Sequence, residues 1–270
     1  MLTRHLSESG PRWALDGAWL STSFSFRLMA SVPAAATAGL LDACKTDLEA
    51  SGALLAPVDD DTEVWASGVT YLRSREARMQ ESDTADIYDK VYDAERPELF
   101  FKCAGWRACP DGALIRVRTD ASWNVPEPEL AIVANAAGEI IGYTAGNDVS
   151  SRDIEGANPL YLPQAKVYNG SCALGPGIIL CDADAMRALD IELAIDRDGE
   201  EVFHATTSVT QMKRSLEELI ECLYLELSMP GGSVLLTGAG IVPADDFTLT
   251  PGDTVDIGVG ALRLTNPVAS

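Results

Sequence analysis

The second half of the chain consists of short apolar segments separated by glycine and proline, and this pattern constrains the fold most. The segments are 99–102, 115–118, 178–180, 190–195, 233–236 and 254–257. Their β-branched and large apolar residues are typical of strands. One helix is expected at 215–227, where an apolar stripe repeats with helical spacing and indicates a core-facing side. Its members are Leu216, Leu219, Ile220, Leu223 and Leu227. We therefore predict a mostly β, α+β fold.

The chain divides into two predicted domains. Residues 1–62 are expected to form a small N-terminal α/β cap domain, with a strand or turn at 13–19 and a helix at 34–54. Residues 63–270 are expected to form the larger domain, which begins with a strand at 64–71. Polar helical segments follow at 74–81, with Ser74 as its N-cap, and at 86–95.

The composition excludes several classes of partner. The formal net charge is −21 and the pI is near 4.3, which argues against nucleic acid and against an anionic membrane surface. Six cysteines are scattered without a C-x-x-C pair, so neither a zinc site nor a disulfide framework is expected. No apolar run is long enough for a transmembrane helix, and the start lacks a secretory signal. We predict a cytoplasmic protein with reduced thiols.

Two glutamates and an aspartate form the strongest candidate site. Glu127 and Glu129 are two residues apart where a loop passes into a buried strand, so both carboxylates point to one face. The next predicted strand ends at Asn147-Asp148 and can return a third carboxylate to the same place. Such an oxygen set suits magnesium, calcium or manganese rather than zinc. The alternative is a solvated acidic rim that binds no metal.

Several spaced motifs in residues 63–270 resemble the fumarylacetoacetate hydrolase superfamily. They are Glu127-x-Glu129, the stretch from Gly142 to Asp153, Lys166, Gly175-Pro176, Leu236-Thr237-Gly238, Leu249-x-Pro251-Gly252-Asp253-x-Val255 and Leu262-x-x-x-Asn266-Pro-Val. The resemblance implies a β-roll core, a metal held by three carboxylates, usually magnesium, and a homodimer or homotetramer.

The resemblance also assigns roles to residues. Glu127, Glu129 and Asp148 match the metal ligands, Arg152 matches an arginine that shapes the substrate pocket, and Lys166 matches the lysine beside the metal. Lys166 lies among apolar residues, where desolvation and a nearby cation are expected to lower the pKa of its amine and make it a base. The alternative for Lys166 is an ordinary surface lysine.

One departure from the family pattern bears on the reaction. Hydrolytic members carry a histidine that activates water, and Ser74 stands where that histidine would fall. The chain contains only His5 and His204, and both are remote from the motifs. A hydrolytic reaction is therefore not the first expectation.

The sequence segments 68–76, 91–99 and 150–166 are similar to those of one subgroup, the 2-keto-3-deoxy-D-arabinonate or xylonate dehydratases. In that subgroup Glu155 replaces a glutamine common in hydrolases. The resemblance implies elimination of water from a 2-keto-3-deoxy pentonate, through a metal-stabilised enolate, to give 2,5-dioxopentanoate. The substrate partner is then a small 2-oxo sugar acid.

Three residues are candidates for proton transfer. Lys166 is predicted to be the base, with Glu76 and Glu155 as acid or base partners that protonate the leaving hydroxyl. The alternative for Glu76 is a solvated glutamate on a helix.

Four residues are candidates for substrate binding. Arg152 and Arg75 are predicted to hold substrate oxygens, and Ser74 either contacts the substrate or caps a helix. Gly238 allows a close approach of backbone N–H groups to the substrate carboxylate, although its sequence context departs from the family turn.

Two rival functions remain. One is another reaction of the same fold, namely hydrolysis of an acylpyruvate or diketo sugar acid, isomerisation, or decarboxylation. The other is a metal-binding module without catalytic activity.

Overall fold

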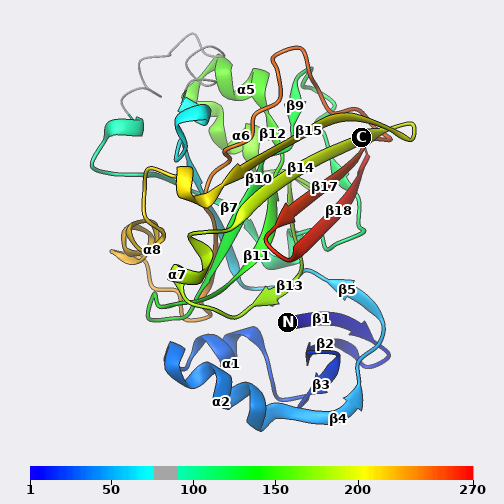
Figure 1. The fold of residues 1–270 in the computed structure, drawn as a ribbon, viewed down its shortest axis with the longest axis vertical. Coiled ribbons are helices and arrows are strands. Elements are labelled where there is room, and N and C mark those ends of the chain that lie inside the picture. Colours follow the sequence, from blue (N-terminus) through cyan, green and yellow to red (C-terminus); the bar gives the residue numbers. More distant parts are fainter. Residues whose placement is uncertain (76–90, 270) are drawn as a thin grey trace.

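The computed structural model describes residues 1–75 and 91–269 (Figure 1). The N-terminal part carries five short strands and two helices, which lie together at one end of the molecule in Figure 1. They are β1 (Leu2–Ser7), β2 (Gly10–Leu15), β3 (Ala18–Leu20), α1 (Phe26–Ala30), α2 (Ala34–Cys44), β4 (Lys45–Glu49) and β5 (Ala53–Leu55). Of the predicted helix at 34–54 only the part up to Cys44 is correct. From Lys45 the chain is a strand because it pairs with Leu20 of β3.

An eleven-stranded sheet runs through both predicted domains. Its other strands are β6 (Glu63–Gly68), β7 (Glu98–Ala104), β10 (Pro128–Ala134), β11 (Ile140–Asp148), β13 (Cys172–Ile179) and β16 (Ser233–Leu236). The order is β4-β3-β2-β1-β13-β11-β10-β16-β6-β7, and β5 pairs with β1. The N-terminal strands join the rest through the antiparallel pairing of Leu2 with Ile178. The boundary at residues 62/63 stays a prediction.

A five-stranded sheet covers part of the large sheet. Its strands are β8 (Ile115–Arg116), β14 (Asp190–Arg197), β15 (Glu200–Ser208), β17 (Thr254–Val259) and β18 (Leu262–Ala269), in the order β15-β14-β17-β18-β8. Apolar side chains from both sheets form one buried cluster, and Leu130 of β10, Tyr143 of β11 and Ile257 of β17 belong to it. A separate two-stranded pair joins β9 (Asn124–Val125) to β12 (Ser150–Ser151). The predicted mostly β class is confirmed.

Short helices connect the strands. They are η1 (Gly105–Arg107), α5 (Arg152–Ala157), η2 (Pro159–Tyr161), α6 (Leu162–Lys166), α7 (Ala183–Met186), η3 (Val209–Gln211) and α8 (Leu216–Tyr224). Helix α8 confirms the predicted apolar stripe, and Ser215 caps it by accepting a hydrogen bond from the Glu218 N–H at 3.1 Å. The stripe ends before Leu227, which lies beyond the helix and is 43% exposed. No helix within residues 1–75 and 91–269 is long and apolar enough to cross a membrane.

Asp253 stabilises the turn before β17. Its carboxylate is fully buried and accepts hydrogen bonds from Arg197 Nε at 2.7 Å, from Arg197 Nη2 at 2.8 Å and from the Thr250 N–H at 2.9 Å. Burial alone would raise the pKa of Asp253, but these hydrogen bonds outweigh it and hold the pKa below its usual value. This ion pair ties β14 to the turn that follows Pro251-Gly252.

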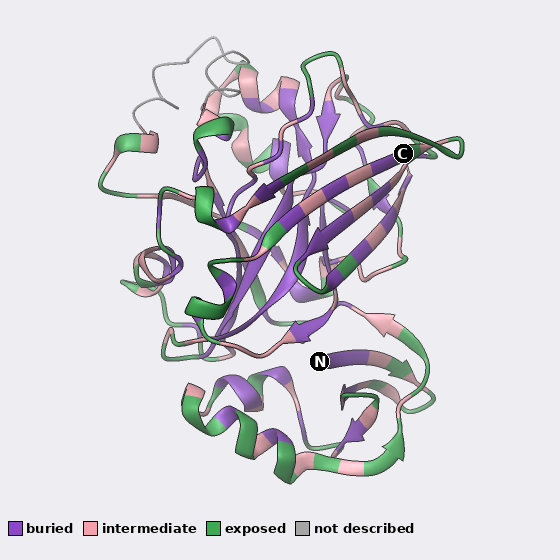
Figure 2. Ribbon diagram, in the orientation of Figure 1, coloured by how far each residue is buried: buried purple, intermediate pink, exposed green. Residues whose placement is uncertain are grey.

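The centre of the large sheet positions the candidate site. Every residue of β10 is buried, and burial continues along β11 and β16, whereas β15 and α2 are mostly exposed (Figure 2). Strands β10 and β11 run antiparallel with Pro128 opposite Asn147. The start of β10 therefore lies beside the end of β11, where the Asp148 N–H donates to the Glu127 carbonyl at 3.0 Å.

Candidate active site

Three carboxylates meet where β10 begins and β11 ends. Glu127 directly precedes β10, Glu129 lies on it and Asp148 is the last residue of β11. All three are buried, and each offers a carboxylate oxygen within 4.8 Å of the others. The antiparallel register thus assembles the predicted set, and the alternative of a solvated acidic rim is wrong.

Glu129 is the most deeply buried of the three, and its ionised form is the most disfavoured by its surroundings. Burial, followed by the charges of Asp148 and Glu127, raises its pKa well above the usual value. Its Oε2 accepts a hydrogen bond from the Gly238 N–H at 2.6 Å, whereas its buried Oε1 has no hydrogen-bond partner among the described residues. A hard divalent cation satisfies both the free oxygen and the clustered charge, so the residues fit magnesium.

Two lysines balance the carboxylates. Lys166, at the end of α6, places Nζ 2.8 Å from Glu127 Oε1 and 3.0 Å from Asp148 Oδ2. Lys102, on β7, is fully buried and forms an ion pair with Asp148 Oδ1. Its Nζ also donates to the Val149 carbonyl at 3.2 Å and to the Lys166 carbonyl. Lys102 therefore links β7, the end of β11 and α6 behind the carboxylates.

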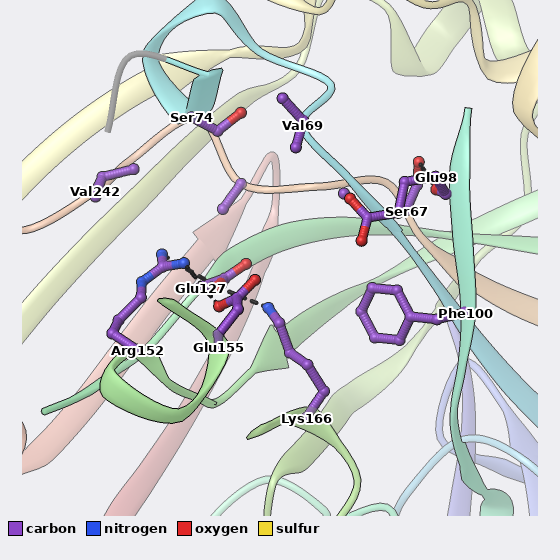
Figure 3. A pocket seen from close by; sticks show the side chains of 12 residues that line it. Ser67, Val69, Ser74, Glu98, Phe100, Glu127, Arg152, Glu155, Lys166 and Val242 are labelled. Atoms are coloured by element: carbon purple, nitrogen blue, oxygen red, sulfur yellow. Dashed lines mark hydrogen bonds and ion pairs between the residues drawn. The ribbon is translucent and has the colours of Figure 1, made fainter. Parts of the chain in front are cut away.

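Arg152 and Glu155 complete the charged wall from the first turn of α5. Arg152 Nη2 lies 3.1 Å from Glu127 Oε1, and its Nη1 lies 3.3 Å from Glu155 Oε2. Both residues are buried, and both side chains point into the same pocket as Glu127 and Lys166 (Figure 3). The structure thus brings four predicted charged site residues together at the pocket, with Asp148 and Glu129 behind them.

The pocket has two chemically different sides. It is lined by Ser67, Gly68, Val69, Ser74, Glu98, Phe100, Glu127, Arg152, Glu155, Lys166, Ala239 and Val242. The charged wall faces apolar groups that come from the turn after β6 and from the segment after β16 (Figure 3). The pocket therefore combines a charged wall with an apolar one.

The structure places three of the predicted site residues differently. Ser74 lines the pocket but is no N-cap, because it lies within the helical turn 72–75 and donates to the Tyr71 carbonyl at 2.8 Å. Arg75 does not line the pocket, and its guanidinium lies over the Tyr92 ring at 5.1 Å. The Gly238 N–H is directed to the Glu129 carboxylate rather than to a substrate.

Other predictions concern Glu76 and the two histidines. Glu76 falls outside the described residues, as does most of the predicted helix at 74–81. His5 lies on β1, and His204 lies on β15, where it hydrogen-bonds Glu192 at 2.9 Å. Neither histidine lines the pocket.

Sequence reasoning missed three residues of β7. Glu98, Phe100 and Lys102 alternate along the strand, and the first two line the pocket while Lys102 supports it from behind. The signal was a glutamate and a lysine four residues apart in an otherwise apolar strand, a spacing that puts both on one face. Gly68 makes room for this wall, because a Cβ there would lie 2.1 Å from Glu98 Oε2.

The family described as Fumarylacetoacetate (FAA) hydrolase C-terminal matches residues 63–269. The chain belongs to the fumarylacetoacetate hydrolase family. The Haloferax volcanii protein named "Probable 2-keto-3-deoxyxylonate dehydratase" is 49% identical over 210 residues, covering 76% of this chain and 72% of that protein. A 2-dehydro-3-deoxy-D-arabinonate dehydratase of Saccharolobus solfataricus is 44% identical over 216 residues, covering 77% and 72%.

Solved structures of a 2-keto-3-deoxy-D-arabinonate dehydratase extend the similarity to the whole fold. The apo form superposes with a TM-score of 0.83 at 33% identity, covering 99% of this chain and 98% of that chain. A second structure, complexed with magnesium and 2,5-dioxopentanoate, gives a TM-score of 0.78 with the same identity and coverage. The similarity therefore includes residues 1–62, which the family match leaves out.

Proposed function

We propose that this protein is a magnesium-dependent hydro-lyase that dehydrates a 2-keto-3-deoxy pentonate, arabinonate or xylonate, to 2,5-dioxopentanoate. The observation that carries the proposal is the buried carboxylate triad with Lys166 beside it, where Glu127 and Lys166 line one pocket. The relatives named above are dehydratases of these sugar acids, and one related structure holds magnesium with 2,5-dioxopentanoate.

Magnesium would be held by Glu127, Glu129 and Asp148. When bound there, it supplies positive charge that favours loss of a proton from the carbon next to the keto group. Calcium and manganese suit the same oxygen ligands.

Different residues of the chain are proposed for the separate proton transfers. Lys166 is the proposed base for the C3 proton, because its Nζ lies between the carboxylates and the pocket. Glu155 is the proposed acid that protonates the C4 hydroxyl as it leaves as water, and Glu98 on β7 is a second candidate. The elimination leaves a C3=C4 double bond; a proton then moves from C5 to C3, and the resulting C5 enol takes up a proton at C4 to give the aldehyde of 2,5-dioxopentanoate. Arg152 is the proposed ligand of a substrate oxygen, and its guanidinium forms ion pairs with Glu127 and Glu155.

Product analysis tests the function directly. The purified protein with magnesium is incubated with 2-keto-3-deoxy-arabinonate, with 2-keto-3-deoxy-xylonate and with an acylpyruvate. We expect an aldehyde product lighter than the pentonate by one water, and no product after chelation of the metal. Pyruvate release from the acylpyruvate, without any product from the pentonates, would reject dehydration in favour of hydrolysis.

We also propose that the protein assembles as a homodimer or homotetramer in the cytoplasm. This assembly is the one expected from the resemblance to the family. A monomer in size-exclusion chromatography with light scattering would contradict this assembly.

A further inference from the structure

Val69 lines the pocket from an unfavourable backbone conformation. Its φ is +53°, in the left-handed region where a β-branched residue clashes with its own backbone. The two other non-glycine residues with positive φ in the described chain are Asp16 and Asp198, whose side chains tolerate this region far better. A glycine would hold the Val69 conformation at the lowest cost.

The neighbours of Val69 hold the backbone in this conformation. Thr70 is fully buried, its hydroxyl donates to the Thr237 carbonyl at 2.6 Å, and its carbonyl accepts from the Lys213 N–H at 2.9 Å. On the other side, Gly68 is paired with Glu98 in the ladder between β6 and β7. Long-range contacts therefore fix both flanks, and such contacts can maintain a strained residue between them.

The Val69 side chain forms part of the apolar wall. It is 7% exposed and lines the pocket together with Ala239 and Val242. In Figure 3 it lies across the pocket from Glu127 and Lys166. The isopropyl group therefore lies on the side of the pocket opposite Glu127 and Lys166.

Polar groups flank Val69. The hydroxyls of Ser67 and Ser74 each donate to a backbone carbonyl, at 3.0 Å and 2.8 Å, and keep lone pairs that can accept a hydrogen bond. A terminal substrate hydroxyl beside these serines can be satisfied, whereas one pressed against the isopropyl group loses its hydration without replacement.

We propose that Val69 determines substrate length: it stops the carbon chain of a 2-keto-3-deoxy sugar acid at five carbons. This inference rests on the proposed function, since the keto-acid end must lie at the carboxylates for the other end to meet Val69. A six-carbon acid carries one more hydroxymethylene group, which has two heavy atoms. The isopropyl group occupies the space that this group needs.

The first test compares substrates of two lengths. Val69→Ala removes two carbon atoms and Val69→Gly removes three, so both open space for the extra group. We expect the ratio of kcat/KM for the pentonate to kcat/KM for the 2-keto-3-deoxy hexonate of matching C4 configuration to fall at least tenfold in both variants. A ratio within twofold of the wild type in both variants would overturn the proposal.

The second test separates the backbone conformation from the function. Both variants lose the isopropyl group, but only glycine accepts φ +53° without strain, so Val69→Gly should melt above Val69→Ala. Val64, a fully buried valine in β6, is the matched control, and there the glycine variant should melt below the alanine variant. If the glycine variant melted below the alanine variant at position 69 as well as at position 64, the inference that Val69 is strained would be rejected.

The two proposals fail in different ways. If the wild-type protein dehydrates no pentonate, the proposed function is rejected and the length preference with it, while the melting order still tests the conformation of Val69. If the wild type dehydrates pentonates and the ratio does not change in the variants, only the role of Val69 is rejected.

Discussion

Replacing Lys102 with methionine tests how the buried charges of the site are balanced. Four buried carboxylates face three buried cations among the described residues around the pocket. They are Glu127, Glu129, Asp148 and Glu155 against Lys102, Arg152 and Lys166. The substitution keeps most of the side-chain volume and removes one positive charge, so the formal charge of the group changes from −1 to −2.

The expected loss of stability follows from the burial of the ion pair. Lys102 is fully buried, and the Asp148 side chain is 2% exposed. Removing one partner of a buried pair costs about 3–5 kcal/mol, and two charges about 4 Å apart in a medium of effective dielectric constant near 20 attract by about 4 kcal/mol. We expect the free energy of unfolding of the metal-free protein to fall by about 3–5 kcal/mol.

Magnesium should compensate for this loss. The cation brings the variant's site from −2 to neutrality, whereas it brings the wild-type site from −1 to +1. Magnesium should therefore raise the free energy of unfolding more in Lys102→Met than in the wild type. Urea unfolding of both proteins, with a chelator and with saturating magnesium, measures the two differences.

An exposed lysine provides the control. Lys45 lies on β4 at the surface, and Lys45→Met should change neither the stability nor the response to magnesium by more than about 0.5 kcal/mol. Two results would refute this balance of charges. One is equal stabilisation of Lys102→Met and wild type by magnesium, and the other is a loss of less than about 1 kcal/mol in the free energy of unfolding of metal-free Lys102→Met.

Three further predictions concern other parts of the site and the fold. Glu129→Gln should lose magnesium binding and turnover together, whereas Lys166→Ala should retain the metal, measured by calorimetry, and lower kcat about a hundredfold or more. Asp253→Asn should lower the free energy of unfolding by about 3 kcal/mol at neutral pH. Since burial is outweighed by hydrogen bonds and the pKa of Asp253 is lowered, its contribution is present above about pH 4 and is lost as the pH falls through the folded-state pKa. Unfolding curves of the variant and wild type should therefore converge in acid. Gly238→Ala places a Cβ 2.1 Å from Thr70 Oγ1 at a φ of +94° and should weaken both the fold and magnesium binding, because its N–H holds Glu129; unchanged magnesium affinity would contradict it.

The part of the site that could be predicted comes from residues that are close together in the sequence. Glu127 and Glu129 share one strand entrance, and Asp148 ends the following strand, so an antiparallel hairpin is sufficient to bring them together. The periodicity of α8 was equally local, and Ser215 marked its start. These features depend on contacts that the chain makes with itself over about twenty residues.

Other features depend on partners far away in the sequence. Residues 45–49 have a composition compatible with a helix but form a strand, because β3 offers an edge to pair with. Lys102 contributes to the site only because the large sheet brings β7 close to Asp148 and α6. A lysine in an apolar strand does not by itself indicate which carboxylate it meets.

The sequence by itself determined the mostly β class and the three convergent carboxylates, because period-two alternation and hairpin pairing are local. The neighbouring lysine was implied by the resemblance to the family. Only the tertiary structure decided which residues line the pocket and that the Gly238 N–H donates to the Glu129 carboxylate. It also decided that Val69 lines the pocket at a positive φ. The physical reason is that backbone strain and buried charge pairs persist only when contacts from distant segments hold them in place. The spacing of residues in the sequence does not show which distant segments make those contacts.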